Sequence, residues 1–356
     1  MGVDYKPVIW NRNKYMYDAV LLIAVASYIY LYIRVGVNFQ DSSQPIERPI
    51  MRMRAFGSCA FLMLSFILCI GPLARLNEKF LPLLYNRRHF GVLTACVAAV
   101  HANYVLGWYY AFSPTNKYEA LFSSNTNFDQ LLGFPFEAFG IFAFLMLLIL
   151  AVTSHDFWLS FLSAPIWKRL HMGIYFGYAS VVLHISLGPL QTDRDPVFAI
   201  VFFTSVFAVS ILHFIVAMKD RQADSMFVRE PNPGDDTPWI EVGQVSQIEN
   251  KRAKIVSLPD EERVAVFRNG NTLSAVHNVC AHQNGPLGEG KIVDGCITCP
   301  WHGFQYNPED GRSPAPFEEK IATYRLKLEA GTVYVDPRPL APGTYVEPTL
   351  IGDAYV

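Results

Sequence analysis

Two cysteines and two histidines in the C-terminal third of the chain have the spacing of a metal site. Cys280 and His282 form a Cys-x-His arm, and sixteen residues further on Cys299 and His302 form a Cys-x-x-His arm. Each arm offers one thiolate and one imidazole, so the two arms together can place two cysteines on one iron and two histidines on the other. The pattern therefore predicts a [2Fe–2S] cluster with mixed ligation.

A tetrahedral zinc site accepts the same ligand types and is the alternative interpretation. Zinc fingers, however, pair cysteines in one arm and histidines in the other, whereas each arm here mixes the two. Among the other cysteines, Cys296 is expected to be an ordinary strand residue. Cys59, Cys69 and Cys96 lie singly in apolar runs, where a buried hydrophobic role is the default. The six cysteines therefore do not indicate a disulfide framework.

The sequences around the two arms, CAHQNGPLGEG and CPWHGFQYNPEDGRS, resemble the cluster loops of Rieske ferredoxins and of the Rieske domains of ring-hydroxylating oxygenases. The resemblance covers about residues 238–336. It implies a small all-β domain that holds the cluster on Cys280, His282, Cys299 and His302. Two hairpins, around Asn269-Gly270-Asn271 and Ala330-Gly331, agree with such a domain.

Three positions depart from the respiratory kind of Rieske protein. Gly285 and Trp301 stand where that family has two disulfide-bonded cysteines, and Phe304 stands where it has a serine hydroxyl that donates to the cluster. Fewer hydrogen-bond donors stabilise the reduced cluster less. We therefore expect a reduction potential near ~−150 mV rather than +300 mV. We also expect no coupling of imidazole deprotonation to electron transfer near neutral pH.

The N-terminal part has the composition of a membrane protein. Half of the 356 residues are apolar and 17% are charged. Residues 1–219 contain 16 Lys and Arg against 11 Asp and Glu, and residues 220–356 contain 13 against 20. A helix needs ~20 mainly apolar residues to cross a bilayer, and six segments qualify, at about 17–37, 56–74, 89–112, 133–153, 170–189 and 196–218. Buried helices of a large soluble protein are the alternative.

We therefore expect an α-helical membrane bundle of six transmembrane helices over residues 1–218, surrounded by lipid. A linker (219–237), the Rieske domain (238–336) and an extended Pro-rich tail (337–356) follow. Six spans place both termini on one side, which carries eleven Lys and Arg against six on the other. This bias favours the cytoplasmic side of a bacterial inner membrane for both termini. The net charge of −2 gives no indication of a nucleic-acid partner.

Histidines recur in the third and fifth predicted spans, where ionisable residues are costly and usually functional. His89 and His101 are twelve residues apart, and His171 and His184 are thirteen apart. Because the two spans run parallel, the histidines match in depth, with roughly 18–20 Å between the two levels. That spacing suits two bis-histidine haems. An ideal helix would turn its two histidines to different faces, so a bulge or haems on different flanks would be needed.

The stretches RRHFGVLTACVAAVHANYVLGW and WKRLHMGIYFGYASVVLHISLG, with Thr153-Ser154 between them, resemble the ferric reductase-like transmembrane domain. Ferric reductases, NADPH oxidases and the bacterial haem membrane subunit of methionine sulfoxide reductase share this domain. The resemblance covers about residues 55–218. It implies one or two b-type haems on His101, His171 and His184, with His89 or His213 as the fourth ligand.

Eukaryotic members of that family supply their haems from a C-terminal flavin and NADPH module. This chain has no G-x-G-x-x-G fingerprint, and its Rieske domain occupies that place. We therefore expect an oxidoreductase that passes single electrons from a cytoplasmic ferredoxin or flavin reductase, through cluster and haem, to an external or periplasmic acceptor. Two alternatives stay open: a quinone-linked redox subunit, and a membrane-anchored Rieske carrier for a separate oxygenase.

Overall fold

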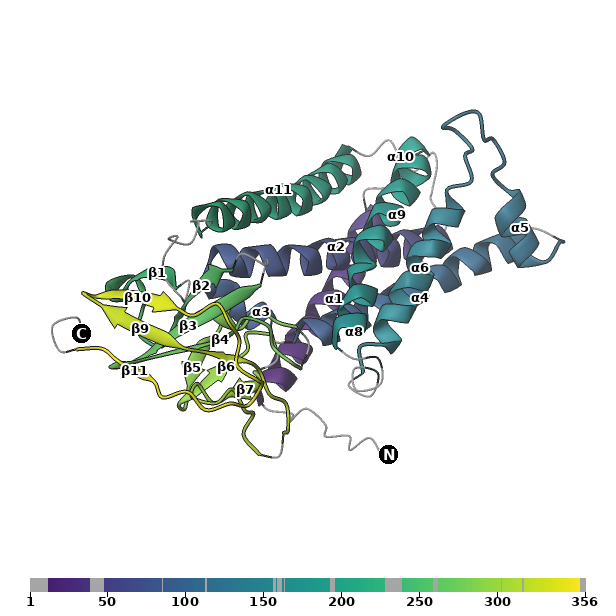
Figure 1. Cartoon of the computed structure of the whole chain (residues 1–356). Coiled ribbons are helices and arrows are strands. Elements are labelled where there is room, and N and C mark those ends of the chain that lie inside the picture. Colours follow the sequence, from purple (N-terminus) through teal and green to yellow (C-terminus); the bar gives the residue numbers. More distant parts are fainter. Residues whose placement is uncertain are drawn as a thin grey trace. The chain divides into compact units, whose positions relative to one another are not determined.

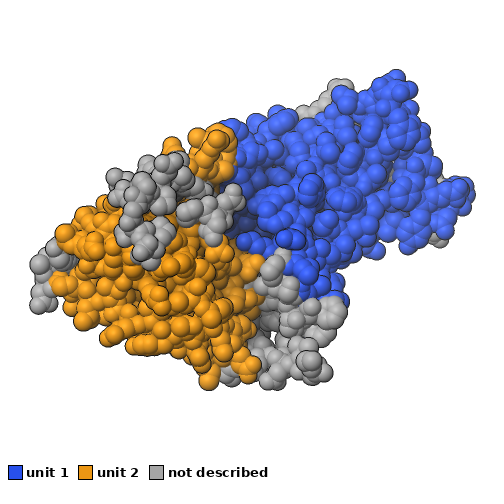
Figure 2. All heavy atoms as spheres, in the orientation of Figure 1, with its two compact units in different colours: residues 1–73, 86–213 blue, residues 74–85, 214–356 orange. Residues whose placement is uncertain are grey.

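The computed structural model describes residues 12–38, 48–84, 86–112, 114–155, 158, 162, 164–192, 196–227, 239–258, 262–282, 284–301, 303–315 and 317–352. The chain divides into two compact units (Figure 2). One comprises residues 1–73 and 86–213, and the other comprises residues 74–85 and 214–356. The second unit thus combines the β-rich C-terminal part with the helical residues 74–84 and 214–227.

The first unit is built mainly from helices, and the second unit also contains helical segments (Figure 1). They are α1 (Arg12–Asn38), α2 (Arg48–Leu76), η1 (Glu78–Phe80), α3 (Leu81–Leu84), α4 (Arg87–Phe112), α5 (Lys117–Ser123), α6 (Glu137–Val152), α8 (Ala164–Met172), α9 (Ile174–Leu187), α10 (Pro189–Thr192) and α11 (Pro196–Phe227). Within the described residues, five stretches are long and apolar enough to cross a membrane: Lys14–Val35, Arg48–Leu76, Arg87–Trp108, Ile166–Gln191 and Pro196–Lys219. The α-helical membrane architecture is therefore confirmed.

The remaining predicted span, at 133–153, is a shorter apolar helix. Helix α6 has 16 residues, which at 1.5 Å per residue give about 24 Å against a hydrocarbon layer of about 30 Å. The helix begins only after Gly133-Phe134-Pro135-Phe136, because proline disfavours helical geometry in the residue before it. The N-terminal residues of the predicted span are thus outside the helix.

The fifth predicted span is not one regular helix. Helices α8 and α9 are separated at Gly173, whose amide donates to the carbonyl of Leu170 at 2.9 Å. This tighter turn interrupts the regular helix between His171 and His184.

The core of the helical unit is built from α2, α4, α6, α9 and α11. Phe61 and Leu64 of α2 pack in one buried cluster with Leu147 of α6, Tyr178 of α9 and Phe202 of α11. The side chains of Ser65 and Tyr178 also share a hydrogen bond of 3.1 Å between α2 and α9. Packing of these apolar faces fixes the helices that carry the candidate ligands.

Helix α11 ends later than expected. The sequence predicted a linker from residue 219, but the helix continues to Phe227. The residues added after Met218, KDRQADSMF, include good helix formers and neither glycine nor proline, so the helix ends only near the Pro-Asn-Pro-Gly sequence. The rest of the predicted linker, residues 228–237, lies outside the described residues.

The second unit contains a small all-β domain (Figure 1). Its strands are β1 (Ile240–Gln244), β2 (Ala253–Ser257), β3 (Arg263–Asn269), β4 (Thr272–His277), β5 (Lys291–Val293), β6 (Cys296–Thr298), β7 (Gln305–Tyr306), β8 (Thr323–Tyr324), β9 (Leu326–Glu329), β10 (Thr332–Val335) and β11 (Thr349–Leu350). They form three antiparallel sheets, in the orders β1-β10-β9, β11-β4-β3-β2 with β8 also on β4, and β5-β6-β7. The third sheet carries the second cysteine–histidine arm.

Both predicted hairpins are present, with one change. Strands β3 and β4 pair on either side of Gly270-Asn271. The residues before Ala330-Gly331 form two strands that belong to different sheets: β8 pairs with β4, whereas β9 pairs with β10. Arg325 is the residue at which the chain passes from one sheet to the other.

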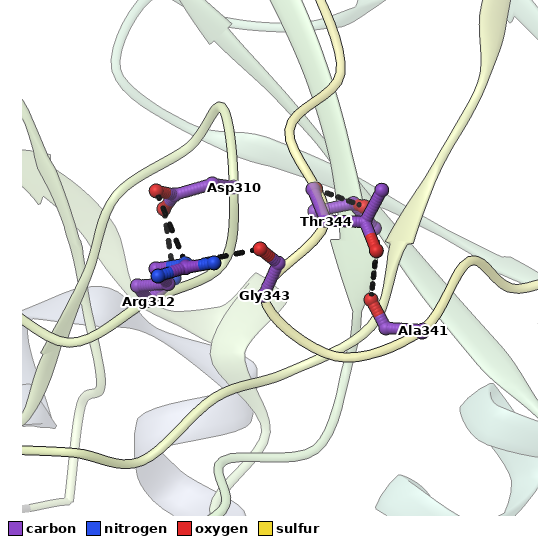
Figure 3. Close-up of polar contacts among 6 residues, drawn as sticks. Asp310, Arg312, Ala341, Gly343 and Thr344 are labelled. Carbon is purple, nitrogen blue, oxygen red and sulfur yellow. Dashed lines mark hydrogen bonds and ion pairs between the residues drawn. The ribbon is translucent and has the colours of Figure 1, made fainter.

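Residues 337–351 are packed onto the β domain, and the prediction of an extended tail needs correction for them. Strand β11 adds to the edge of β4, and Ile351 is 1% exposed in the core. The Arg312 side chain lies between Asp310 and the carbonyl of Gly343, to which its Nε donates at 3.0 Å (Figure 3). The amide of Val346 donates to the carbonyl of Glu309 at 2.8 Å. We call residues 337–351 the C-terminal strap.

The strap is expected to stabilise the β domain through Ile351. Replacing a fully buried Ile by Ala costs roughly 2–5 kcal/mol, so Ile351→Ala should lower the temperature at which the cluster absorbance is lost by about 10 °C or more. Leu350→Ala is the matched control, because Leu350 is 70% exposed. Equal melting temperatures for the two variants would show that the strap does not contribute to the core.

Candidate functional site

The first arm follows β4, and backbone and side-chain hydrogen bonds fix its conformation. The Cys280 amide donates to the Gly285 carbonyl at 2.9 Å, and the Asn284 amide donates to the Cys280 carbonyl at 2.7 Å. The buried Asn278 accepts from the amide of Gly288 at 2.6 Å. These bonds close a tight loop in which Cys280 is fully buried.

The second arm turns between β6 and β7. The Cys299 amide donates to the Phe304 carbonyl at 2.8 Å, and Cys299 is 2% exposed. The two arms approach each other at Gly285, where a Cβ atom would lie 2.8 Å from Cys299 Sγ. Only glycine allows that approach, because real Cβ atoms do not come so close to another heavy atom.

Of the two histidines in the arms, the structure describes His282. The ring of His282 stacks on Phe304 of the second arm, with 4.9 Å between ring centroids and 7° between planes. His302 lies outside the described residues. Among the described part of the chain no three His, Cys, Asp or Glu side chains are grouped around one point. A [2Fe–2S] cluster does not require such a group, since each of its irons takes two protein ligands.

Tyr306 was not singled out from the sequence, yet its hydroxyl lies 3.4 Å from Cys280 Sγ. Burial raises the pKa of Tyr306 well above its ordinary range, and the charges of Cys280 and Cys299 raise it further. The hydroxyl therefore stays protonated and donates to the sulfur when the cysteine is a thiolate. The signal in the sequence is the short β6–β7 hairpin, which pairs Tyr306 with Ile297 beside the cysteines.

Cys296 behaves as expected. It lies in β6, and its Sγ is 3.7 Å from the side-chain oxygen of Asn307. Burial, with Asp294 nearby, raises the pKa of its thiol, so it is not a reactive thiolate at neutral pH. The two buried cysteines, the approach at Gly285 and the Tyr306 hydroxyl fit a cluster that needs two thiolates and close backbone.

In the helical unit, His101 and His184 face each other. Their ring centroids are 6.5 Å apart and the planes cross at 78°. His101 Nδ1 donates to the carbonyl of Met53 at 2.9 Å, and His184 Nδ1 donates to the carbonyl of Phe136 at 3.1 Å. Both Nδ1 atoms are thus occupied, which leaves each Nε2 for another partner.

The two imidazoles have equivalent surroundings, each made of a backbone carbonyl and a glycine on one neighbouring helical turn. Gly57 follows Met53 by four residues, and a Cβ there would lie 2.8 Å from His101 Nδ1. Gly140 follows Phe136 by four residues, and a Cβ there would lie 2.7 Å from His184 Nδ1. In each case one helical turn supplies both the carbonyl acceptor and the glycine against which the ring packs.

His171 lies in a different setting. Its ring stacks on Trp167 at a centroid distance of 3.8 Å, and its Nε2 lies 3.2 Å from the Thr153 hydroxyl. Trp167 Nε1 donates to the Thr153 carbonyl at 2.7 Å. Thr153 and Trp167 therefore orient this imidazole together.

His89 and His213 differ in their hydrogen-bond partners. His89 Nδ1 donates to Asp18 at 2.7 Å, and Asn86 donates to the same carboxylate at 2.6 Å. His213 donates from Nδ1 to the carbonyl of Val209 in its own helix, and its Nε2 lies 3.2 Å from the Tyr175 hydroxyl. Both nitrogens of His213 are occupied within the protein.

Comparison with known proteins finds two families, one for the β domain and one for the helical part. Residues 238–325 match the Rieske [2Fe–2S] domain family, and residues 56–182 match the ferric reductase like transmembrane component. The second match includes His101 and His171 and ends two residues before His184.

Two relatives each match one part of the chain. The anthranilate 1,2-dioxygenase ferredoxin subunit of Burkholderia cepacia is 32% identical over 100 residues, which are 28% of this chain and 91% of that protein. The protein-methionine-sulfoxide reductase heme-binding subunit MsrQ of Caulobacter vibrioides is 27% identical over 186 residues, 52% of this chain and 81% of that protein. The solved complex of oxygenase and ferredoxin in carbazole 1,9a-dioxygenase covers 29% of this chain at 25% identity, with a TM-score of 0.27.

A buried two-cysteine site in a β domain that follows a bundle of apolar helices defines an integral membrane redox protein. The chain belongs to the Rieske [2Fe–2S] family through residues 238–325. Its membrane part matches the ferric reductase like transmembrane component over residues 56–182.

The Tyr306 hydroxyl is expected to raise the reduction potential of the cluster, because a donor to a cysteine sulfur stabilises the more negative reduced state. Tyr306→Phe should lower the potential by roughly 65–130 mV, the one-electron equivalent of a hydrogen bond to a charged group. Redox titration of the full chain followed by electron paramagnetic resonance measures the change.

Tyr324→Phe is the matched control, because Tyr324 is also fully buried and its hydroxyl lies 3.4 Å from Glu262. A potential unchanged in Tyr306→Phe, or lowered equally in both variants, would contradict this role of Tyr306.

Proposed function

We propose that this protein conducts single electrons across a membrane, from the Rieske cluster to b-type haem. The cluster ligands in this proposal are Cys280, His282, Cys299 and His302. The observation that carries the haem step is the pair His101 and His184, which face each other from α4 and α9 with both Nδ1 atoms bound to backbone carbonyls. That pair lies in a chain whose β domain belongs to the Rieske family.

The two imidazoles are close to each other, with 6.5 Å between ring centroids. His101 and His184 would hold a haem through their Nε2 atoms, since each Nδ1 is bound to a backbone carbonyl. The MsrQ relative is described as a heme-binding subunit, and its likeness to this chain supports the same cofactor here.

A second haem is proposed on His171 and His89. Asp18 accepts from Nδ1 of His89 in the way that the carbonyls accept from Nδ1 of His101 and His184. His213 is the weaker candidate, because Val209 and Tyr175 engage both of its nitrogens. His101, His184 and His89 are thus oriented through Nδ1, whereas His171 is held by its stacking on Trp167 and by the contact of its Nε2 with Thr153.

The proposed route begins at a cytoplasmic donor, a ferredoxin or a flavin reductase, and ends at an acceptor on the other side of the membrane. The excess of Lys and Arg on the side of the termini supports the cytoplasmic placement of the β domain. Each step moves one electron, so the protein needs to supply ligands, burial and tuning, and no acid–base residue.

The route is tested in sealed vesicles that contain the full chain. When a reductant is added on the side of the membrane that carries the β domain, the haem absorbance of the wild-type protein should change to that of the reduced form. Cys299→Ser should abolish this change while leaving the haem reducible by dithionite. A wild-type protein with a cluster and no haem spectrum would instead identify a membrane-anchored Rieske carrier. Haem reduction at the wild-type rate in Cys299→Ser would exclude the cluster from the route.

The surroundings of His184 give a second test. In Gly140→Ala the new methyl group would overlap the imidazole, since its Cβ would lie 2.7 Å from Nδ1. The imidazole must move, and we expect the haem content per protein to fall at least twofold, because small displacements of metal ligands cost roughly 10–100-fold in affinity. The pyridine haemochrome assay measures that content.

Gly107→Ala is the matched control, because a Cβ at Gly107 meets no atom within 4 Å. Full haem content in Gly140→Ala, or an equal loss in both variants, would argue against ligation by His184.

A further inference from the structure

Phe304 joins the two cluster arms through an aromatic contact. It belongs to the second arm, where its carbonyl accepts the amide of Cys299 at 2.8 Å. Its ring, however, lies parallel to the imidazole of His282 in the first arm, at 4.9 Å and 7°. The side chain is 8% exposed, so it covers one face of that imidazole with a water-excluding surface.

The ring of Phe304 cannot easily turn away from His282. Phe317 packs against it with centroids 4.9 Å apart and planes at 57°, and Tyr306 packs at 5.3 Å and 51°. These rings belong to the same buried cluster as Cys280 and Cys299. Close packing of this kind holds side chains in single rotamers.

The contact has two physical consequences for an iron bound through His282. The plane of an imidazole sets its overlap with the metal orbitals, so a fixed plane fixes the magnetic anisotropy of the reduced cluster. The apolar ring also keeps water from the imidazole face, and poor solvation disfavours the extra negative charge of the reduced state. Both consequences depend on an aromatic ring at position 304 and not merely on the lack of a hydroxyl.

We propose that Phe304 is a positioning residue for His282, which sets the plane of the imidazole and holds the cluster potential low. The proposal rests on the role of His282 as a cluster ligand. It is independent of the haem route, so a chain without haem would defeat the proposed conduit and leave this inference to be judged on its own data.

The test compares three variants of the full-length protein: Phe304→Leu, Phe304→Tyr and Phe267→Leu. The tyrosine keeps an aromatic ring, and Phe267 is a 1% exposed ring of the same cluster that controls for the loss of core volume. The measurements are iron and sulfide content, the g values of the reduced cluster, and a redox titration.

We expect Phe304→Leu to shift the g values and to raise the ratio of reduced to oxidised cluster about threefold at the wild-type midpoint, equivalent to about 28 mV for one electron. Phe304→Tyr and Phe267→Leu should keep the wild-type g values. If Phe304→Leu loses its cluster while the other two retain theirs, the positioning role is also supported.

Wild-type g values and midpoint in a fully loaded Phe304→Leu would overturn the proposal. So would the same change or the same cluster loss in Phe267→Leu, because the effect would then follow from core volume and not from the contact with His282.

Discussion

An imidazole that binds a metal through one nitrogen must have its other nitrogen fixed, or the ring can turn away from the metal. The helical unit meets this constraint twice in the same way. His101 and His184 each donate Nδ1–H to a carbonyl one turn before a glycine, and each ring packs on that glycine. Because any larger residue would displace the ring, the constraint also decides how closely α2 approaches α4 and α6 approaches α9.

In the β domain, glycine and aromatic contacts position the side chains that would bind the cluster. Its two arms are loops at strand ends, and they converge where Gly285 leaves room for Cys299 Sγ. Tyr306 donates toward the sulfur of Cys280, whereas Phe304 covers His282 with an apolar ring. One contact favours the reduced cluster and the other disfavours it, so their balance sets its potential. A relay of single electrons depends on such tuning more than on groups that carry protons.

Much of this organisation could be predicted from the sequence, because ligand spacing and apolar length are local properties. The Rieske domain, the ferric reductase-like membrane part and the approach of His101 to His184 are of this kind. Contacts distant in sequence could not be predicted in the same way. Asp18 on His89, Ile351 in the core and Tyr306 beside Cys280 depend on how separate elements pack. Where helix α11 ends and where α8 and α9 divide depends on backbone geometry that apolar content alone does not encode.

The central claim is that the electron held by the cluster passes to haem on His101 and His184. It is tested most directly by reducing the cluster in a rapid pulse within the full-length protein and following both centres in time. The account predicts that the signal of the reduced cluster decays at the rate at which the haem absorbance of the reduced form appears, and that His184→Leu removes this phase. A cluster that stays reduced beside oxidised, spectrally intact haem would contradict it.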